Sequence, residues 1–242
     1  MTTRSQRPEN TEVPNNNEDI FNMILASTVH DMKNSLSMLG ESLNIILNSI
    51  DIELLSDHAK ANCGVIQYES SRVNNSLMQL LALYKLENEQ LPFNPNYLNI
   101  CDFLEEQKLR QLPLLEARHI TCEVDVDEDL EGVFDECLLS TVLENIIGNA
   151  IRYSNSKILI QCTQTETTNI QVFDDGPGYP EIMIDMADKY MQGINHSTGS
   201  TGLGLFFAKK IADLHSHKGL KGSINLSNCS TLGGGKFEIC IP

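Results

Sequence analysis

The chain has 242 residues and is 41% hydrophobic, which is enough for one large domain or two modest ones with buried cores. Its formal net charge is −16 and it has no strong basic cluster, which argues against nucleic acid and anionic lipid as partners. No uninterrupted apolar stretch approaches the roughly 20 residues that a membrane-spanning helix needs, and the polar N-terminus is unlike a secretory signal. We therefore expect a cytoplasmic protein without a membrane span.

The cysteines are odd in number, 7 in all, and lie scattered along the chain without close pairs. This pattern disfavours a disulfide framework and a zinc site. It predicts reduced and mostly buried thiols, as is usual for a cytoplasmic protein.

Residues 1–19 are polar and predict a disordered tail, whereas residues 20–88 predict two long amphipathic helices. Apolar residues there alternate at steps of four and three, which is the heptad seam of helices that pack lengthwise. The first series is Leu25, Val29, Met32, Leu36, Leu39, Leu43, Ile46 and Ile50, and the second, interrupted at Ser70, is Ala59, Cys63, Ile66, Val73, Leu77, Leu80 and Tyr84. A hairpin of two such helices leaves much apolar surface in water, so we predict a homodimer in which two hairpins form a four-helix bundle.

Residues 89–97 contain Pro92 and Pro95, which indicates a linker, and the periodicity changes after it. In residues 98–242 we expect strands at 98–100, 119–126, 157–163, 169–173, 222–227 and 236–241, and helices at 102–118 (disturbed at Pro113), 135–152 (capped by Asp135) and 202–215. This mixture predicts an α/β sandwich with helices on one face of the sheet, following the helical hairpin.

The first helix carries His30 one residue after a seam position. At about 100° per residue, its side chain is predicted to lie roughly 130° from the centre of the seam and to face solvent. A neutral imidazole nitrogen is a competent nucleophile near neutral pH because its ordinary pKa is about 6.5. Asp31 could hold the other ring N–H, and Asn34 lies one helical turn further on. Taken alone, His30 is more simply an exposed helix residue without a role, and the remaining histidines are interpreted as structural or solvated: His58, His119, His196, His215 and His217.

Two asparagines, Asn145 and Asn149, lie four residues apart in a predicted helix and therefore share one face. Mg²⁺ prefers oxygen ligands and keeps most of its waters, so one amide oxygen together with nucleotide phosphates is sufficient to hold it. Arg152 offers a cation for the phosphates, and Tyr153 offers an aromatic face for a base. Taken alone, the asparagine pair fits equally well as two exposed polar positions.

Two glycine-containing segments complete the pattern. Asp174 follows an apolar strand and precedes Gly176 and Gly178; a carboxylate at a strand end can accept the adenine amino group, and the glycines let the backbone turn sharply. The other segment opens a predicted helix, where backbone N–H groups point at phosphate; it consists of Thr201, Gly202, Leu203 and Gly204.

In this order, the segment His30-Asp31-Met32-Lys33-Asn34 and the nucleotide-binding segments resemble the catalytic core of two-component sensor histidine kinases, from about Ile20 to the last residue. The resemblance implies a dimerisation and histidine-phosphotransfer hairpin at 20–88, followed by a GHKL-type ATP-binding domain at 98–242. It implies a soluble kinase that autophosphorylates His30 from ATP and passes the phosphoryl group to an aspartate of a response regulator.

The resemblance also assigns roles to single residues. Asn149 is expected to ligate Mg²⁺, Asn145 to support the phosphates, and Asp174 to bind the adenine amino group. ATPases of the gyrase, Hsp90 and MutL kind carry a glutamate general base at the position of Asn145, whereas here Glu144 is one residue off and rotated by about 100°. A site without that base suits an imidazole nucleophile. The amide of Asn34 implies that the chain also dephosphorylates its regulator.

Two departures from the family pattern favour a different reading. Ser200 stands where a third glycine is usual, and the lid at 179–199 lacks the usual Phe-rich box and Arg, so that Lys189 is the candidate γ-phosphate contact. The alternative is a histidine-phosphotransfer or scaffold protein with a degenerate nucleotide domain, against which the intact Asn149 and Asp174 speak. No sensor domain is recognisable, so we expect a separate sensor protein to act in trans.

Overall fold

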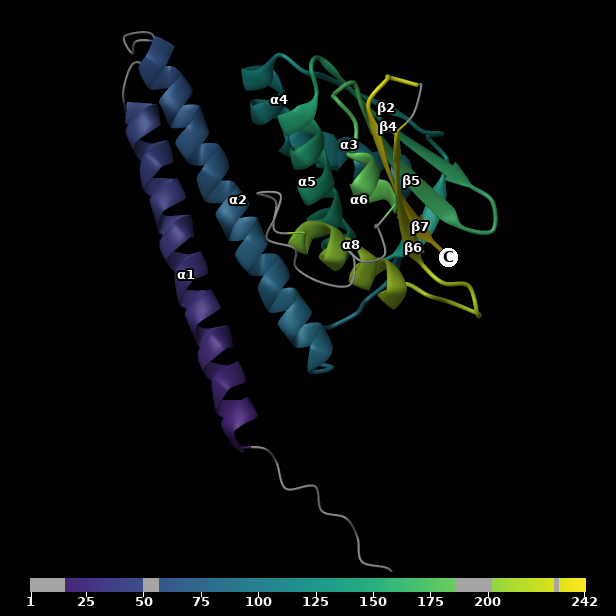
Figure 1. Cartoon of the computed structure of the whole chain (residues 1–242), viewed down its shortest axis with the longest axis horizontal. Helices are drawn as coiled ribbons and strands as arrows, with labels where there is room; N and C mark the ends of the chain where they lie inside the picture. Colours follow the sequence, from purple (N-terminus) through teal and green to yellow (C-terminus); the bar gives the residue numbers. More distant parts are fainter. Residues whose placement is uncertain (1–15, 50–56, 186–201, 229–230) are drawn as a thin grey trace, which may run out of the picture.

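The structure is a computed structural model that describes residues 16–49, 57–185, 202–228 and 231–242 (Figure 1). The predicted tail up to residue 15, the turn between the two long helices, and most of the predicted lid, with Lys189, Ser200 and Thr201, lie outside the described residues. None of the described helices combines the length and the apolar character needed to cross a membrane.

The N-terminal part is the predicted helical hairpin. Helix α1 spans Asn16–Ser49 and α2 spans Asp57–Glu87, and the two run side by side along most of their length (Figure 1). The helices come close where Gly40 faces Ser70, since a Cβ on the glycine would lie 3.9 Å from the serine Oγ. Helix α1 begins at Asn16 rather than near residue 20, so the end of the predicted tail is helical.

The C-terminal lobe contains two sheets. A small antiparallel sheet pairs β1 with β3, and the main sheet has the strand order β2-β4-β5-β7-β6, in which only β2 and β4 are parallel. The elements of the lobe are β1 (Asn96–Asn99), α3 (Ile100–Arg110), α4 (Leu112–Arg118), β2 (Thr121–Asp125), β3 (Glu131–Phe134), α5 (Glu136–Tyr153), β4 (Lys157–Gln164), β5 (Thr168–Asp174), α6 (Glu181–Asp185), α8 (Leu203–Leu214), β6 (Ser223–Asn228) and β7 (Gly235–Ile241).

Helices α5 and α8 cover one face of the main sheet, with α2 on their outer side (Figure 1). Their fully buried side chains include Leu143 and Ile147 of α5 and Phe207 of α8, and they share one core with alternate strand residues: Ile158, Ile160, Ile170, Phe237 and Ile239. Burying one such side chain stabilises the fold by about 1.5–3 kcal/mol. Packing of several of them against the sheet therefore holds both helices, and so also their ends, in place. The predicted α/β sandwich with one covered face is confirmed.

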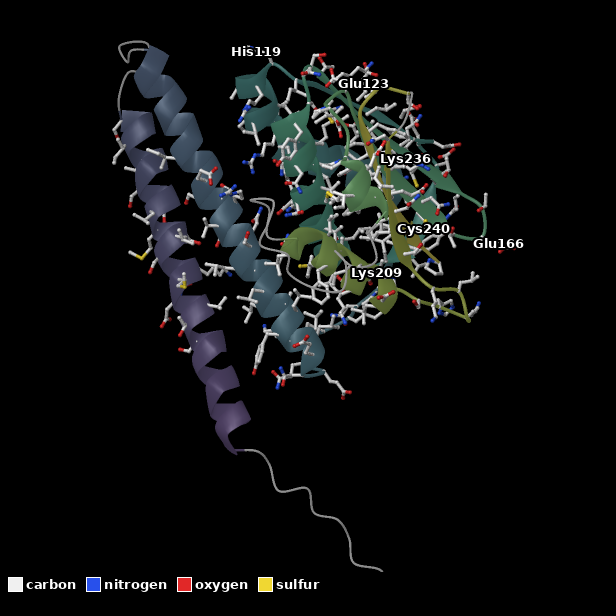
Figure 2. The ribbon with its side chains drawn as sticks, viewed as in Figure 1. His119, Glu123, Glu166, Lys209, Lys236 and Cys240 are labelled. Carbon is white, nitrogen blue, oxygen red and sulfur yellow. The ribbon has the colours of Figure 1, made fainter. Side chains whose placement is uncertain are left out.

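Several predicted boundaries differ from the structure. The single helix expected at 102–118 is two helices, because α3 ends before Gln111 and Pro113 sits in the first turn of α4, where its missing N–H is harmless. His119 (labelled in Figure 2) has a left-handed φ of 55° and caps α4, so β2 begins only at Thr121. The short elements β3 and α6 were not predicted.

The cysteines are less buried than predicted. Among the cysteines whose side chains the structure describes, all are free thiols, Cys122 alone is buried and Cys137 is exposed; they are Cys101, Cys122, Cys137, Cys162 and Cys240. Cys240 (Figure 2) alternates with the buried Ile239 and Ile241, and so it lies on the uncovered face of the sheet. Alternation along a strand, rather than residue type, decides this exposure.

A buried histidine joins the start of α5 to the end of α8. The backbone N–H of Asp135 donates to His215 Nε2 at 3.0 Å, so the other ring nitrogen carries the proton and Nδ1 donates to the Ile211 carbonyl at 2.8 Å. His215 is only 4% exposed, and burial lowers its pKa. Of the two interpretations given for this histidine, structural or solvated, the structure supports the first.

The same point also holds the linker. Asp135 caps α5 as predicted, with Oδ1 accepting from the Leu138 N–H at 3.0 Å, while Oδ2 accepts from the Asn94 N–H at 2.8 Å. The ring of Phe93 packs edge-on against His215 with 5.0 Å between centroids. The linker is therefore fastened to the lobe at Phe93 and Asn94.

We predict that His215 lowers the free energy of unfolding in mild acid. An unfolded histidine binds a proton below about pH 6.5, whereas the folded His215 resists protonation, so the free energy of unfolding should fall as the pH drops below that value. His215→Gln keeps an acceptor for Asp135 without titrating, so its unfolding free energy, measured in urea, should fall less between about pH 7 and pH 5. His217→Gln, at an exposed neighbour, is the control. Equal pH slopes for His215→Gln and the parent chain would contradict this role.

Candidate nucleotide site

Asp174, the last residue of β5, lies at the centre of the candidate site. Its Oδ1 accepts from the backbone N–H of Gly176 at 2.8 Å and from that of Gly235 at 3.2 Å. Within the part of the chain that the structure describes, no hydrogen bond reaches Oδ2. The carboxylate is thus held from one side by main-chain donors and can accept from a ligand amine with its other oxygen.

Three glycines make room for this carboxylate. A Cβ on Gly176 would overlap the carbonyl oxygen of Tyr153, one on Gly234 would lie 2.6 Å from Asp174 Oδ1, and one on Gly235 would lie 2.7 Å from Oδ2. Gly176 was predicted from the sequence. Gly234 and Gly235 were not, although the run of glycines before β7 was a signal that a backbone comes close to another group.

The adjacent Asp175 serves the fold instead. Its carboxylate accepts from the backbone N–H of Asn155 at 2.8 Å, from the backbone N–H of Ser156 at 2.9 Å and from the Ser156 hydroxyl at 2.7 Å. Burial alone would raise the pKa of Asp175, but these hydrogen bonds outweigh it and lower the pKa to about 2. Asp175 therefore fastens the loop after α5 to the end of β5.

The predicted asparagine pair meets the start of α8. Asn149 Nδ2 donates to Asn145 Oδ1 at 3.2 Å, which leaves the Asn149 oxygen as the potential ion ligand. The backbone of Gly204 lies so close to the Asn145 side chain that a Cβ there would overlap it. Gly202, with a φ of 63°, caps α8 without a side-chain hydrogen bond, and the buried Leu203 anchors the first turn in the core. The structure thus brings Asn145 and Asn149 close to the first turn of α8, where backbone N–H groups can receive an anion.

Arg152 and Tyr153 also lie at this end of α5, and both are exposed. The Arg152 guanidinium is 5.4 Å from the centroid of the Tyr153 ring, while the Tyr153 backbone contacts Gly176. Tyr153 is therefore beside the Asp174 turn, where an aromatic face can stack on a base.

Glu144 does not face the site. Its carboxylate pairs with Arg110 at 3.3 Å, and Arg110 also pairs with Glu106 of its own helix at 2.9 Å. These contacts turn Glu144 toward α3, away from the Asn145 and Asn149 face. The prediction that Glu144 is unsuited to act as a general base agrees with this geometry.

The structure describes fewer side chains of the hairpin than of the lobe. His30 lies on α1, but its side chain is outside the described residues, so its predicted outward orientation stays a prediction. The neighbouring Val29 is buried, whereas Asp31 and Asn34 are exposed. Figure 1 shows α2 between α1 and the lobe, so His30 and the Asp174 site belong to separate parts of this arrangement.

Comparison with known proteins shows which proteins this chain resembles. Residues 134–242 match the family described as histidine kinase-, DNA gyrase B-, and HSP90-like ATPase. Sensor histidine kinase YvrG of Bacillus subtilis (strain 168) is 27% identical in an alignment of 217 positions that covers 86% of this chain and 36% of that protein. The resemblance to a histidine kinase catalytic core is confirmed.

Solved structures extend the likeness. The nucleotide-free catalytic domain of histidine kinase ThkA is 25% identical with a TM-score of 0.53, over 62% of this chain and 97% of that one. ThkA in complex with the response regulator TrrA is 21% identical with a TM-score of 0.58, over 94% of this chain and 63% of that one, and shows the same fold. The chain spans about a third of the length of the curated relatives that it matches.

We predict opposite effects from the two adjacent aspartates. Asp174→Asn can keep the acceptor for Gly176 and Gly235 but presents an amide donor to the adenine amine, so Mg-ADP binding should weaken at least about tenfold with little loss of stability. Asp175→Asn should lower the free energy of unfolding by about 1–3 kcal/mol, because an amide cannot accept all three donors, and should change Mg-ADP affinity much less. Calorimetric titration and urea unfolding measure the two quantities. Equal affinity of Asp174→Asn and the parent chain would exclude Asp174 from adenine binding.

Proposed function

We propose that this chain is an ATP-dependent protein-histidine kinase that phosphorylates His30 and passes the phosphoryl group to an aspartate of a response regulator. The observation that carries the proposal is the oriented Asp174 carboxylate, set in the same lobe as Asn145, Asn149 and the N-terminal turn of α8. The match of this lobe to the histidine kinase-like ATPases supports it.

Different residues of the candidate site suit different parts of ATP. Asp174 Oδ2 and the Tyr153 ring would receive the adenine, and the N–H groups at Gly202, Leu203 and Gly204 would receive the phosphates. The Asn149 oxygen would hold Mg²⁺ together with the phosphates, and the bound ion would neutralise phosphate charge. Roles for Lys189 and Thr201 in holding the phosphates remain predictions, because both lie outside the described residues.

The chemistry needs no strong base. A neutral imidazole nitrogen of His30 attacks the γ-phosphorus in line, a nitrogen–phosphorus bond forms, and the bond to the β,γ-bridging oxygen breaks to release ADP. Asp31 would hold the second ring nitrogen. The ion pair that turns Glu144 toward Arg110 is consistent with a site that does not activate water or a serine hydroxyl.

The lobe must change its position for this transfer, because α2 lies between it and α1 (Figure 1). Glu89 has a left-handed φ of 55°, and the Gln90 N–H donates to the Lys85 carbonyl at 2.7 Å, so α2 is closed off just after Glu87. Since Asn94 is bound to the lobe through Asp135, we place the pivot between Gln90 and Phe93. This pivot would lie within the proposed linker, 89–97, between the proposed hairpin (20–88) and the proposed ATP domain (98–242).

The regulator partner is inferred from the structure of ThkA in complex with the response regulator TrrA, because this chain shares the fold of ThkA. Dephosphorylation of the regulator through Asn34 is a further expectation, and it would show as slower loss of label from the regulator with Asn34→Ala. The sensor acting in trans and the cytoplasmic location also remain predictions. The alternative of a phosphotransfer protein with a degenerate nucleotide domain is less well supported, because both backbone hydrogen bonds that orient the Asp174 carboxylate are present.

We predict that His30→Ala abolishes acid-labile labelling from γ-labelled ATP while Mg-ADP affinity stays within about twofold, because His30 is the nucleophile and lies outside the cleft. Labelling is measured on filters after acid and base treatment, and binding by calorimetry. Ser37→Ala, at an exposed position on the same predicted face of α1, is the matched control and should keep full labelling. Undiminished labelling of His30→Ala would exclude His30 as the acceptor.

The hairpin supports the predicted homodimer. Seam residues on both helices are exposed in the single chain, with Leu39 at 64%, Ile46 at 53% and Ile66 at 54%. Apolar side chains in this number along one stripe are normally covered by a partner. A second copy would cover them by forming the four-helix bundle.

We predict that the parent chain sediments as a dimer at micromolar concentration, and that Leu39→Glu with Ile46→Glu makes it monomeric. Two buried carboxylates in the bundle would cost several kcal/mol. Ser37→Glu, off the seam, should leave the dimer intact. A monomeric parent chain at this concentration would contradict the proposed bundle.

A further inference from the structure

Asn228, the last residue of β6, forms two side-chain hydrogen bonds with the backbone of Tyr179, just beyond the Asp174 turn. Its Oδ1 accepts from the Tyr179 N–H at 2.7 Å, and its Nδ2 donates to the Tyr179 carbonyl at 2.9 Å. Opposed residues in an antiparallel ladder exchange the same two hydrogen bonds, but here a side-chain amide takes the place of a strand. Asn228 therefore fixes Tyr179 to the end of β6.

The neighbouring Gly178 leaves room for the Asn228 amide. It has a φ of 76°, and a Cβ there would lie 2.6 Å from Asn228 Oδ1. Only glycine adopts this backbone conformation without strain and also leaves room for the amide. The last glycine of the Asp174 segment is thus required by Asn228 itself, in addition to any approach of the base.

The ring of Tyr179 lies near Asp174 Oδ2, the oxygen that is proposed to accept the adenine amine. A Cβ on Gly235 would lie 2.9 Å from Tyr179 Cε2 and 2.7 Å from Asp174 Oδ2, so the ring and this oxygen border the same backbone atom. Burial raises the pKa of Tyr179, and the negative charge of Asp174 raises it further. Movement of Tyr179 would therefore disturb the surroundings of the oxygen that is proposed to accept the adenine amine.

We propose that Asn228 is a positioning residue of the adenine site, which holds Tyr179 and Gly178 so that Asp174 Oδ2 keeps its place. This inference rests on the proposed function, because it requires that the cleft binds adenine nucleotides. Asn228 itself does not touch the nucleotide. It sets how well the cleft distinguishes adenine, whose amine can donate to Asp174, from guanine, which has a carbonyl oxygen at that position.

The test compares the affinities of Mg-ADP and Mg-GDP by calorimetry in the full chain. Asn228→Ala removes both hydrogen bonds to Tyr179, and it should weaken Mg-ADP binding about tenfold, as expected for the loss of two neutral hydrogen bonds. Mg-GDP binding should weaken less, so the ratio of the two affinities should fall at least about threefold. Asn228→Asp keeps the acceptor for the Tyr179 N–H but sets a carboxylate against the Tyr179 carbonyl, and it should show the same fall.

The control is Asn225→Ala, an exposed asparagine on the same strand, which should bind both nucleotides like the parent chain. If both Asn228 variants bind Mg-ADP within about twofold of the parent and keep its ADP-to-GDP ratio, the inference is overturned even where their unfolding temperature is lower, because the role is then structural. A parent chain that does not bind Mg-ADP would overturn the proposed function and this inference together.

Discussion

The carboxylate of Asp174 is the constraint on which the site depends. Two backbone N–H groups, from Gly176 and Gly235, hold one oxygen, and glycines surround it because any side chain would overlap it. A carboxylate fixed in this way does not need to reorganise when an amine arrives, which is the condition for selective binding. The turn after β5 and the start of β7 can close around it only as glycine-rich backbone.

The other half of the site depends on the two helices that cover the sheet. Helices α5 and α8 are packed on one core, and the His215 and Asp135 contact joins the start of one to the end of the other. Their opposite ends, at Asn149 and Gly202, can therefore hold a constant spacing around a phosphate chain. The Asn94 N–H donates to the same aspartate, Asp135, so a movement of the linker would act directly on the contact between Asp135 and His215.

The sequence predicted those parts of the molecule that local patterns determine. Short apolar segments predicted β4, β5 and β7, the carboxylate of Asp135 predicted the start of α5, and the glycines after Asp174 predicted the turn. Long-range contacts could not be read in this way. Asn228 and Tyr179 are 49 positions apart, and Asp135 and His215 are 80 apart. Their partners are chosen by strand order, which no single segment encodes. Exposure of Cys240 likewise follows from which sheet face the helices cover.

The central claim is that Asp174 Oδ2 receives the adenine amine while the start of α8 holds the phosphates. A crystal structure of the chain with Mg-ADP tests this most directly. The account predicts the exocyclic amine about 3 Å from Asp174 Oδ2, with the Gly176 and Gly235 hydrogen bonds retained and the β-phosphate at the first turn of α8. An adenine ring bound away from Asp174, or phosphates that do not meet α8, would contradict it.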